Sequence, residues 1–346
     1  MNGPMNASIR LSHIAVSQDG GQKVPISELG GSHGLTVASA KMYDRFFGLQ
    51  SVMRQSGDQT EMLGAVLRDA VAQLSDGGQR PGMLVYCKTQ THNTLSDQNW
   101  LRRLADAQGL AHWEVLGLSM TSCASALVAL HFLEACSGAG GGAERAPVIL
   151  LTGEKAFHPS VARLTVGLLA EVPAAAVLNG APDPGAWQLR ASDVHHLPRF
   201  HINPEAMRAE DRSALQEVYT PALIDFVRRF LDRHAGVLDP EMVFVPHNLN
   251  RPVTEALIRA FDWQHRSYRG DVAGTGHAYC SDPLLNLDAL TQSGAPAPQV
   301  LLLAAGTGVT FAACLLDRAR PVATDQEFPA RPGAGQPDTR PAPGLS

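Results

Sequence analysis

One cysteine stands where reactive thiols are usually presented. Cys123 lies in a run of small residues, 117–126, and the apolar run 127–133 follows it. This pattern predicts a tight turn that opens into a buried helix, so the thiol would face unpaired backbone N–H groups and the positive end of the helix dipole. Both features favour the thiolate, which is the nucleophilic form of cysteine. A lone buried cysteine is more often an inert core residue, so the interpretation of Cys123 as a nucleophile depends on its partners.

Two later segments supply candidate partners for this cysteine. His247 follows the apolar run 242–246, and reactive groups of α/β folds collect at the ends of buried strands. His277 follows two closely spaced glycines, and Asp282 lies five positions beyond it. A histidine oriented by a carboxylate can act as a general base. The alternatives are structural: backbone groups would also satisfy either histidine, and Asp282 would also cap a helix that starts near 284.

A glycine turn offers a place for a developing negative charge. Gly306 and Gly308 follow the apolar run 299–305, and a turn of this kind can expose a backbone N–H toward an oxyanion. By contrast, the neighbouring His195 and His196 do not predict a metal site, because adjacent side chains of a strand point to opposite faces. The five cysteines are scattered and form no C-x-x-C pair, so we expect neither a disulfide framework nor a bound metal.

Several elements must position these residues. Fully apolar runs predict buried strands at 82–87, 146–151, 174–178, 242–246 and 299–305. Helical periodicity lies between them, at 61–74, 206–234 and 254–262. Runs that are apolar on both faces are typical of a sheet covered by helices on each side. Strands that alternate with helices in this way predict a layered α/β fold.

Composition limits the class of protein. The 346 residues are 45% hydrophobic and 18% charged, with a net charge of −5, which is typical of a globular chain. The sequence has no Lys/Arg stripe, so we expect no nucleic-acid partner. No signal peptide and no apolar stretch of membrane-spanning length is visible, so we expect a cytoplasmic protein without a membrane partner.

Four segments resemble the type III β-ketoacyl-carrier-protein synthases of the thiolase superfamily. They are the strand-like run 84–91, the turn around Cys123, the segment 247–250 in place of the family's His-Gln-Ala-Asn motif, and the glycine turn 306–308. The similarity extends from about Ile9 to Arg318. It implies a five-layer αβαβα thiolase fold built from two similar halves, and a homodimer.

The resemblance also implies a division of the chain. Residues 1–185 would form an N-terminal half that carries Cys123, and residues 186–320 a C-terminal half that carries His247, His277 and Asp282. Residues 321–346 are rich in Pro, Gly and Ala and lack apolar periodicity, so we expect a disordered tail there.

His277 marks a departure from the condensing synthases of that family. In those enzymes an asparagine stands about thirty residues after the motif histidine, and the two side chains bind the malonyl thioester carbonyl while carbon dioxide leaves. Here the residue thirty positions after His247 is His277. A Gly-His pair followed by an aspartate resembles a branch of the family that transfers an acyl group to oxygen or nitrogen, commonly in natural-product assembly. That resemblance implies a relay of Cys123, His277 and Asp282.

These residues together predict an acyltransferase. Cys123 would take an acyl group from a thioester, and the backbone N–H groups of Cys123 and Gly308 would hold the oxyanion. His277, oriented by Asp282, would then deprotonate a small-molecule acceptor with a hydroxyl or amine. His247 would assist at the carbonyl.

The acyl donor is predicted less directly. The resemblance implies no bound cofactor, because the acyl group arrives on the phosphopantetheine of an acyl-carrier protein or on coenzyme A. Asn250 and Arg251 are the candidate substrate-binding residues. Coenzyme A users of the family carry an arginine two places after the motif asparagine, where this chain has Pro252. The departure favours a carrier protein, although Arg251 is still placed to contact a phosphate.

Two other functions are consistent with the same residues. A histidine that donates from one ring nitrogen would also support decarboxylative carbon–carbon condensation, the 3-oxoacyl-carrier-protein synthase III reaction. The second alternative is a non-catalytic thiolase-fold partner subunit. Such subunits generally lose the nucleophile, whereas this chain retains Cys123.

Overall fold

The computed structural model describes residues 9–17, 20–90, 99–137, 145–164, 167–180, 185–202, 206–248, 251–306 and 309–319. Its strands are β1 (Arg10–Val16), β2 (Gly21–Pro25), β3 (Ser51–Gln55), β4 (Met83–Cys87), β5 (Glu114–Leu118), β6 (Val148–Thr152), β7 (Arg163–Leu164), β8 (Gly167–Leu168), β9 (Ala174–Leu178), β10 (Trp187–His196), β11 (Val243–Pro246), β12 (Gln299–Gly306) and β13 (Thr310–Arg318). Its helices are α1 (Val37–Met42), α2 (Gln59–Ala72), α3 (Trp100–Ala107), α4 (Ser125–Ser137), α5 (Pro159–Ala162), α6 (Ala209–Arg233), α7 (Arg251–Ala260), α8 (Val272–Thr275) and α9 (Asp282–Gln292).

One mixed sheet of nine strands runs through the molecule in the order β11-β12-β13-β10-β1-β9-β6-β4-β5. Two halves of this sheet meet where β1 pairs with β10. From that junction outward, the N-terminal half has the order β1-β9-β6-β4 and the C-terminal half the order β10-β13-β12-β11. In each half the first strand is thus followed by the last strand, then by the one before the last, and then by the second. In both halves the last strand, β9 or β13, is antiparallel to its two neighbours. This repeated order confirms the prediction of two similar halves.

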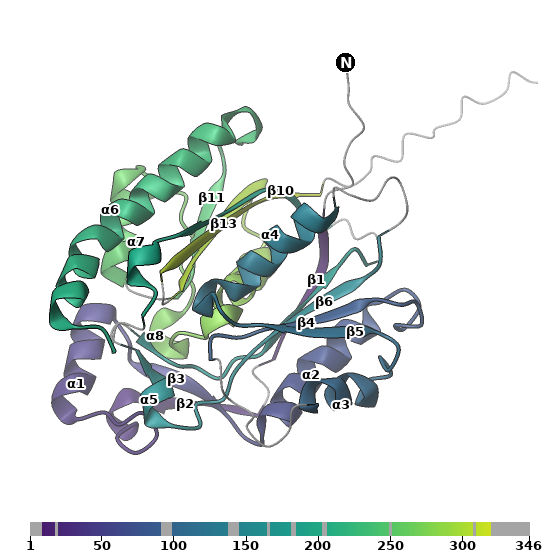
Figure 1. Cartoon of the computed structure of the whole chain (residues 1–346), viewed down its shortest axis with the longest axis horizontal. Helices are drawn as coiled ribbons and strands as arrows, with labels where there is room; N and C mark the ends of the chain where they lie inside the picture. The colour runs from purple at the N-terminus through teal and green to yellow at the C-terminus, as the bar shows by residue number, and fades with distance from the viewer. Residues whose placement is uncertain are drawn as a thin grey trace, which may run out of the picture.

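Helices cover and separate the two halves of the sheet (Figure 1). Residues of α4 and α9 share one apolar cluster with strands of both halves, so these helices lie between them. Residues of α2 and α3 pack on the outer face of the N-terminal half, and residues of α6 and α7 pack on the outer face of the C-terminal half. The five resulting layers are the αβαβα arrangement predicted from the sequence.

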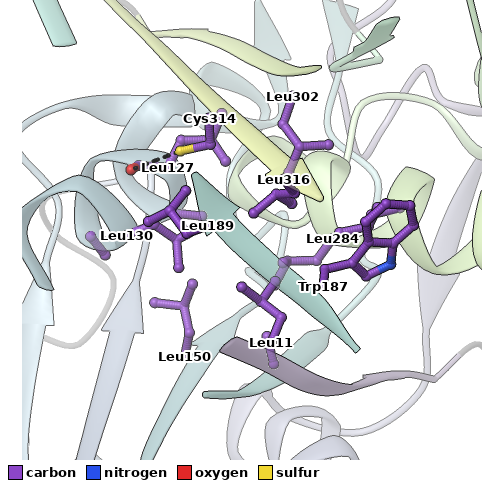
Figure 2. Packing of buried hydrophobic residues seen from close by; sticks show 14 of the residues in the cluster. Leu11, Leu127, Leu130, Leu150, Trp187, Leu189, Leu284, Leu302, Cys314 and Leu316 are labelled. Atoms are coloured by element: carbon purple, nitrogen blue, oxygen red, sulfur yellow. Dashed lines mark hydrogen bonds between the residues drawn. The ribbon is translucent and has the colours of Figure 1, made fainter. Parts of the chain in front are cut away.

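The central layer explains the unbroken apolar run after Cys123. Leu127 and Leu130 of α4 are fully buried, and α4 contacts β4 and β6 of one half as well as β10 and β13 of the other. Figure 2 shows both leucines among side chains that come from the two halves, including Leu150 and Leu316. A helix enclosed on several sides needs apolar residues around its whole circumference, which is why α4 lacks a polar face.

The predicted strands and helices that position the candidate residues are confirmed. The five predicted strands correspond to β4, β6, β9, β11 and β12, and the three predicted helices correspond to α2, α6 and α7. The residue limits of the two halves stay a prediction, and the tail 321–346 lies outside the described residues. Among the described helices, even the 25-residue α6 lacks the uninterrupted apolar length that a bilayer crossing requires.

Candidate active site

A strained turn presents Cys123 at the start of α4. The residue lies in the short 3-10 turn Ser122–Ala124, and Ser122 has a left-handed φ of 53°. Two donors converge on the Ser122 carbonyl: Ser125 Oγ at 2.7 Å and Cys280 Sγ at 3.2 Å. A left-handed residue with a side chain persists only where its surroundings hold it, and these bonds supply that support.

The end of β12 packs closely against the same turn. A Cβ added to Gly306 would lie 2.1 Å from the Thr121 carbonyl oxygen, so any side chain at this position would push the turn away. Gly306 therefore has a steric role beside the turn of Cys123. Gly308, the predicted second oxyanion donor, lies outside the described residues, and its role stays a prediction.

Cys123, His277 and Asp282 form a continuous chain of contacts. His277 Nε2 lies 3.3 Å from Cys123 Sγ, and His277 Nδ1 lies 2.5 Å from Asp282 Oδ2. All three residues are at most 1% exposed. The structure thus brings Cys123 into contact with His277 and Asp282, which lie more than 150 residues later in the sequence, in the predicted order.

Glycine and a neighbouring segment fix the place of His277. Gly276 has a left-handed φ of 84°, and a Cβ there would lie 2.9 Å from Val52 Cγ1. The His277 N–H donates to the Leu168 carbonyl at 3.0 Å, and the His277 carbonyl accepts from the Ala170 N–H at 2.9 Å. These two backbone bonds hold His277 on both sides, so its ring is directed at Cys123 by the fold.

The Asp282 side chain accepts three N–H groups. Besides His277 Nδ1, these are the backbone N–H of Asn248 at 2.7 Å and that of Ala278 at 2.8 Å. Both oxygens of an ionised carboxylate accept hydrogen bonds, so the side chain can satisfy all three donors. An amide in the same place would direct its NH₂ group toward at least one of these N–H groups. Asp282 is also the first residue of α9, so the structural interpretation of this residue holds beside the orienting one.

Electrostatics favour the protonated form of His277. Burial opposes the charge on the ring, but the charges of Asp282 and Cys123 outweigh burial and raise the pKa of His277 to about 10. An imidazolium stabilised in this way is the natural partner of a thiolate at Cys123.

His247 is close to this chain of contacts but has a different electrostatic environment. It follows β11 directly, and its ring centroid lies 5.6 Å from that of His277. Burial, together with the charge of His277, lowers the pKa of His247 to about 3. His247 is consequently a neutral imidazole at physiological pH, able to donate one hydrogen bond but not to carry a charge.

A cavity of about 230 Å³ lies beside residues 246–248. Its lining includes His247, Asn248 and Arg251, whereas Cys123 and His277 do not line it. The Arg251 Nε donates to Glu255 at 3.1 Å, so its charge is already partly compensated. Asn250, the other predicted substrate-binding residue, lies outside the described residues.

Three residues near the site were not identified from the sequence. Cys280 donates to the Ser122 carbonyl, directly before Cys123. Burial raises the pKa of Tyr219 on α6, and the charge of Cys123 adds to this increase. Asn286 is buried on α9 and bonds to the segment that carries His247. Only Asn286 left a signal in the sequence: it is a polar residue in an apolar run, one helical turn after Asp282.

His195 and His196 point apart in β10, as predicted for adjacent strand residues. The His195 ring stacks on Phe226, and His196 Nδ1 lies 2.9 Å from the Thr310 hydroxyl. Across the described ranges, no group of three His, Cys, Asp or Glu side chains is arranged to hold a metal ion.

Comparison with known proteins agrees with this geometry. Residues 237–318 match the family model described as 3-oxoacyl-acyl-carrier-protein (ACP) synthase III C terminal. This match covers the C-terminal part of the chain, which is therefore similar to the C-terminal part of the synthase III enzymes. The matched residues include β11, His247, His277 and α9, which are the C-terminal part of the candidate site. No curated protein sequence matches this chain.

Solved structures share its fold at low identity. The acyltransferase ChlB3 is 16% identical with a TM-score of 0.71, covering 91% of this chain and 98% of its own. FabH from Pseudomonas aeruginosa PAO1, a 3-oxoacyl-(acyl carrier protein) synthase III, is 18% identical with a TM-score of 0.66 over 91% and 99%. The tetronic acid condensing enzyme AbyA1 is 16% identical with a TM-score of 0.68 over 90% and 100%. The thiolase fold predicted from the sequence is thereby confirmed.

Proposed function

We propose that the protein is an acyltransferase of natural-product assembly that moves an acyl group from a thioester, through acyl-Cys123, to a hydroxyl or amine acceptor. The observation that carries this proposal is the position of His277, with one ring nitrogen 3.3 Å from Cys123 Sγ and the other 2.5 Å from Asp282. A histidine oriented in this way is a proton carrier, which transfer to oxygen or nitrogen requires.

In the first half-reaction, Cys123 is already the thiolate, which the start of α4 and the imidazolium of His277 both stabilise. The thiolate attacks the carbonyl of the donor thioester, and the backbone N–H groups of Cys123 and Gly308 stabilise the oxyanion. Neutral His247 donates a hydrogen bond toward the same carbonyl. The bond to the donor sulfur then breaks, and the departing thiol takes the proton from His277, which leaves an acyl-Cys123 thioester.

Acylation prepares His277 for the second half-reaction. It removes the charge of Cys123, which is one of the two charges that raise the pKa of His277. The pKa of His277 therefore falls once the acyl-enzyme has formed, and the neutral ring can accept the proton of the acceptor. The acceptor oxygen or nitrogen attacks the acyl-Cys123 carbonyl, and the Cys123 thiolate leaves to pair again with the imidazolium of His277.

The partners follow from the same chemistry and from the sequence departures. An acyl-carrier protein is the favoured donor over coenzyme A, because Pro252 stands where coenzyme A users carry an arginine. No resident cofactor is needed, since the donor brings its own phosphopantetheine. A homodimer is the expected assembly.

An intact-mass screen of acyl thioesters tests this proposal. The purified protein is incubated with a panel of acyl-carrier-protein and coenzyme A thioesters, including malonyl, and a Cys123→Ala variant serves as control. An acyl adduct that the control lacks, and that disappears when a hydroxyl or amine acceptor is added, supports acyl transfer. Carbon dioxide release with a 3-ketoacyl product would support condensation instead, and a complete lack of adducts would favour the non-catalytic subunit.

A further inference from the structure

We propose that Asn286 is a positioning residue that sets the place of His247 relative to Cys123. Asn286 lies on α9, one helical turn after Asp282, and is 1% exposed. A buried amide inside an apolar helix is costly unless its hydrogen bonds are made, so its partners indicate its role.

Both partners of Asn286 flank His247 in the chain. The Asn286 Nδ2 group donates to the Pro246 carbonyl at 2.8 Å and to Asn248 Oδ1 at 2.8 Å. These residues come directly before and directly after His247. The two donations use both protons of one NH₂ group, so a single side chain holds the segment on each side of the histidine.

Asp282 holds the same segment from the preceding turn of the helix. Its Oδ2 atom accepts the Asn248 N–H at 2.7 Å and His277 Nδ1 at 2.5 Å. One face of α9 therefore fixes both histidines: Asp282 orients His277, and Asn286 completes the hold on the segment of His247. The distance between the two rings is thus set by one rigid helix.

The His247 ring has few polar interactions of its own that fix its position. Its Nδ1 atom is buried and has no hydrogen-bond partner among the described residues. The His247 backbone N–H donates to the Leu303 carbonyl at 3.0 Å, which leaves the neighbours on either side to define the path of the chain. The position of the ring therefore depends on Pro246 and Asn248, the two residues to which Asn286 donates hydrogen bonds.

Gly270 provides the space that this arrangement needs. A Cβ at Gly270 would lie 2.1 Å from Asn286 Oδ1 and 2.9 Å from Asn248 Oδ1. An alanine at this position would therefore displace both amides without removing either of them. Gly270→Ala is consequently a second, independent way to disturb the hold on His247.

The effect on catalysis rests on the proposed function, in which His247 donates to the thioester carbonyl. The test is a double-mutant cycle on the rate of Cys123 acylation, with Asn286→Leu and His247→Ala alone and combined. We expect Asn286→Leu to slow acylation by at least about tenfold in the parent protein and by less than about twofold in the His247→Ala background. If Asn286→Leu slows acylation in the His247→Ala background as much as in the parent protein, the proposal is overturned.

Leu287→Ala is the matched control for general damage to α9. Leu287 is fully buried on the same helix and packs in the central apolar cluster, and its aliphatic side chain cannot hydrogen-bond to the His247 segment. At equal loss of thermal stability, it should slow acylation much less than Asn286→Leu. Equal slowing in the two variants would mean that Asn286 acts only through stability, which would also overturn the proposal.

A spectroscopic measurement keeps the inference testable if no donor acylates Cys123. In long-range ¹H–¹⁵N spectra of the histidine side chains, with His247 assigned from a His247→Gln variant, Asn286→Leu and Gly270→Ala should shift the His247 signals. Leu287→Ala should leave them in place. Unchanged His247 signals in both test variants would contradict the positioning role, whereas a lack of acylation alone would count only against the proposed function.

Discussion

At the scale of single residues, the candidate site separates two histidines by their charge. The pKa of His277 is raised by the charges of Asp282 and Cys123 despite burial, and the pKa of His247 is lowered by burial and by the charge of His277. One ring can thus carry a proton while the other stays neutral. The sequence identified both histidines but not this difference, because it depends on which charges lie beside each buried ring.

Asp282→Asn should disrupt the relay of Cys123, His277 and Asp282 although the two side chains are nearly the same size. An amide has one acceptor atom, so it cannot satisfy the three N–H groups that Asp282 accepts. Without the carboxylate the pKa of His277 falls, and transfer to the acceptor should slow by at least about a hundredfold. Single-turnover intact-mass kinetics measure this rate. Asp288→Asn, which changes a half-buried aspartate of the same helix, is the control, and similar rates in both variants would refute the role of Asp282.

His247 should also leave a signature in the pH dependence of stability. Its pKa is about 3 in the folded protein and about 6.5 when unfolded, so the unfolded state binds the extra proton between these values. The stabilisation is therefore complete above pH 6.5 and is lost as the pH falls toward 3, by about 1.4 kcal/mol per pH unit. Urea unfolding at pH 7 and pH 5 should show a loss about 2 kcal/mol smaller in His247→Gln than in the parent. The same loss in both proteins would contradict a buried neutral His247.

At the scale of elements, local backbone shape decides where the site residues lie. The left-handed Gly276 places His277, and the left-handed Ser122 precedes Cys123. The sequence predicted the glycine turn, because glycine is the usual residue of such a conformation. It did not predict the strain at Ser122, since a serine carries no such signal and the support comes from Cys280, which is distant in the chain.

Gly276→Ala should cost more than the strain of its backbone conformation. Gly276 combines its φ of 84° with a ψ of −160°, a region open essentially to glycine alone. Gly294 has a φ of 68° and nothing lies within 4 Å of an added Cβ, so Gly294→Ala is the reference for a positive φ without a clash. Gly276→Ala adds contacts with Val52 and with the Leu168 carbonyl. We expect it to be less stable than Gly294→Ala by roughly 1–3 kcal/mol. Denaturant midpoints measure the difference, and equal stability of the two variants would mean that the turn has room for a side chain.

Strands differ in how well the sequence predicts them. The fully apolar β4, β6, β9, β11 and β12 were predictable, because burial on both faces leaves a continuous apolar run. β10 was not, because polar residues alternate with apolar ones at its start and its C-terminal half is only partly buried. Gly306 was interpreted as part of the catalytic site, yet it is also the last residue of β12 and pairs with Thr310 of β13. A glycine at the end of an apolar run thus fits a sheet position as well as a catalytic turn, and the sequence alone does not separate the two.

At the scale of the whole molecule, the central layer joins the two halves of the sheet and, with them, Cys123 and His277. Cys123 is attached to α4, and Asp282 begins α9, and both helices lie in the cluster that spans the two halves of the sheet. The distance from Cys123 to His277 therefore depends on a core shared by both halves. The repeated strand order was predictable only through the family resemblance, since the two halves have no obvious sequence identity.

This shared core should make the two halves unfold together. Trp113 lies in the outer cluster of the N-terminal half and Trp263 in that of the C-terminal half, so variants that keep only one of them report each half separately. Leu127→Ala removes buried side-chain volume from the central layer and should lower stability by about 2–5 kcal/mol. Both tryptophan probes should show the same lowered midpoint. A change in one probe only would mean that the halves are independent.

The most direct test of the central claim compares the two half-reactions in a His277→Asn variant. Acylation of Cys123 and discharge of preformed acyl-Cys123 to a hydroxyl or amine acceptor are followed separately by rapid-quench intact-mass spectrometry, with carbon dioxide measured in parallel. We predict that discharge slows by at least about a hundredfold, that acylation slows far less, and that the parent protein releases no carbon dioxide from a malonyl thioester. Equal slowing of both steps, or carbon dioxide release with a 3-ketoacyl product, would contradict the account.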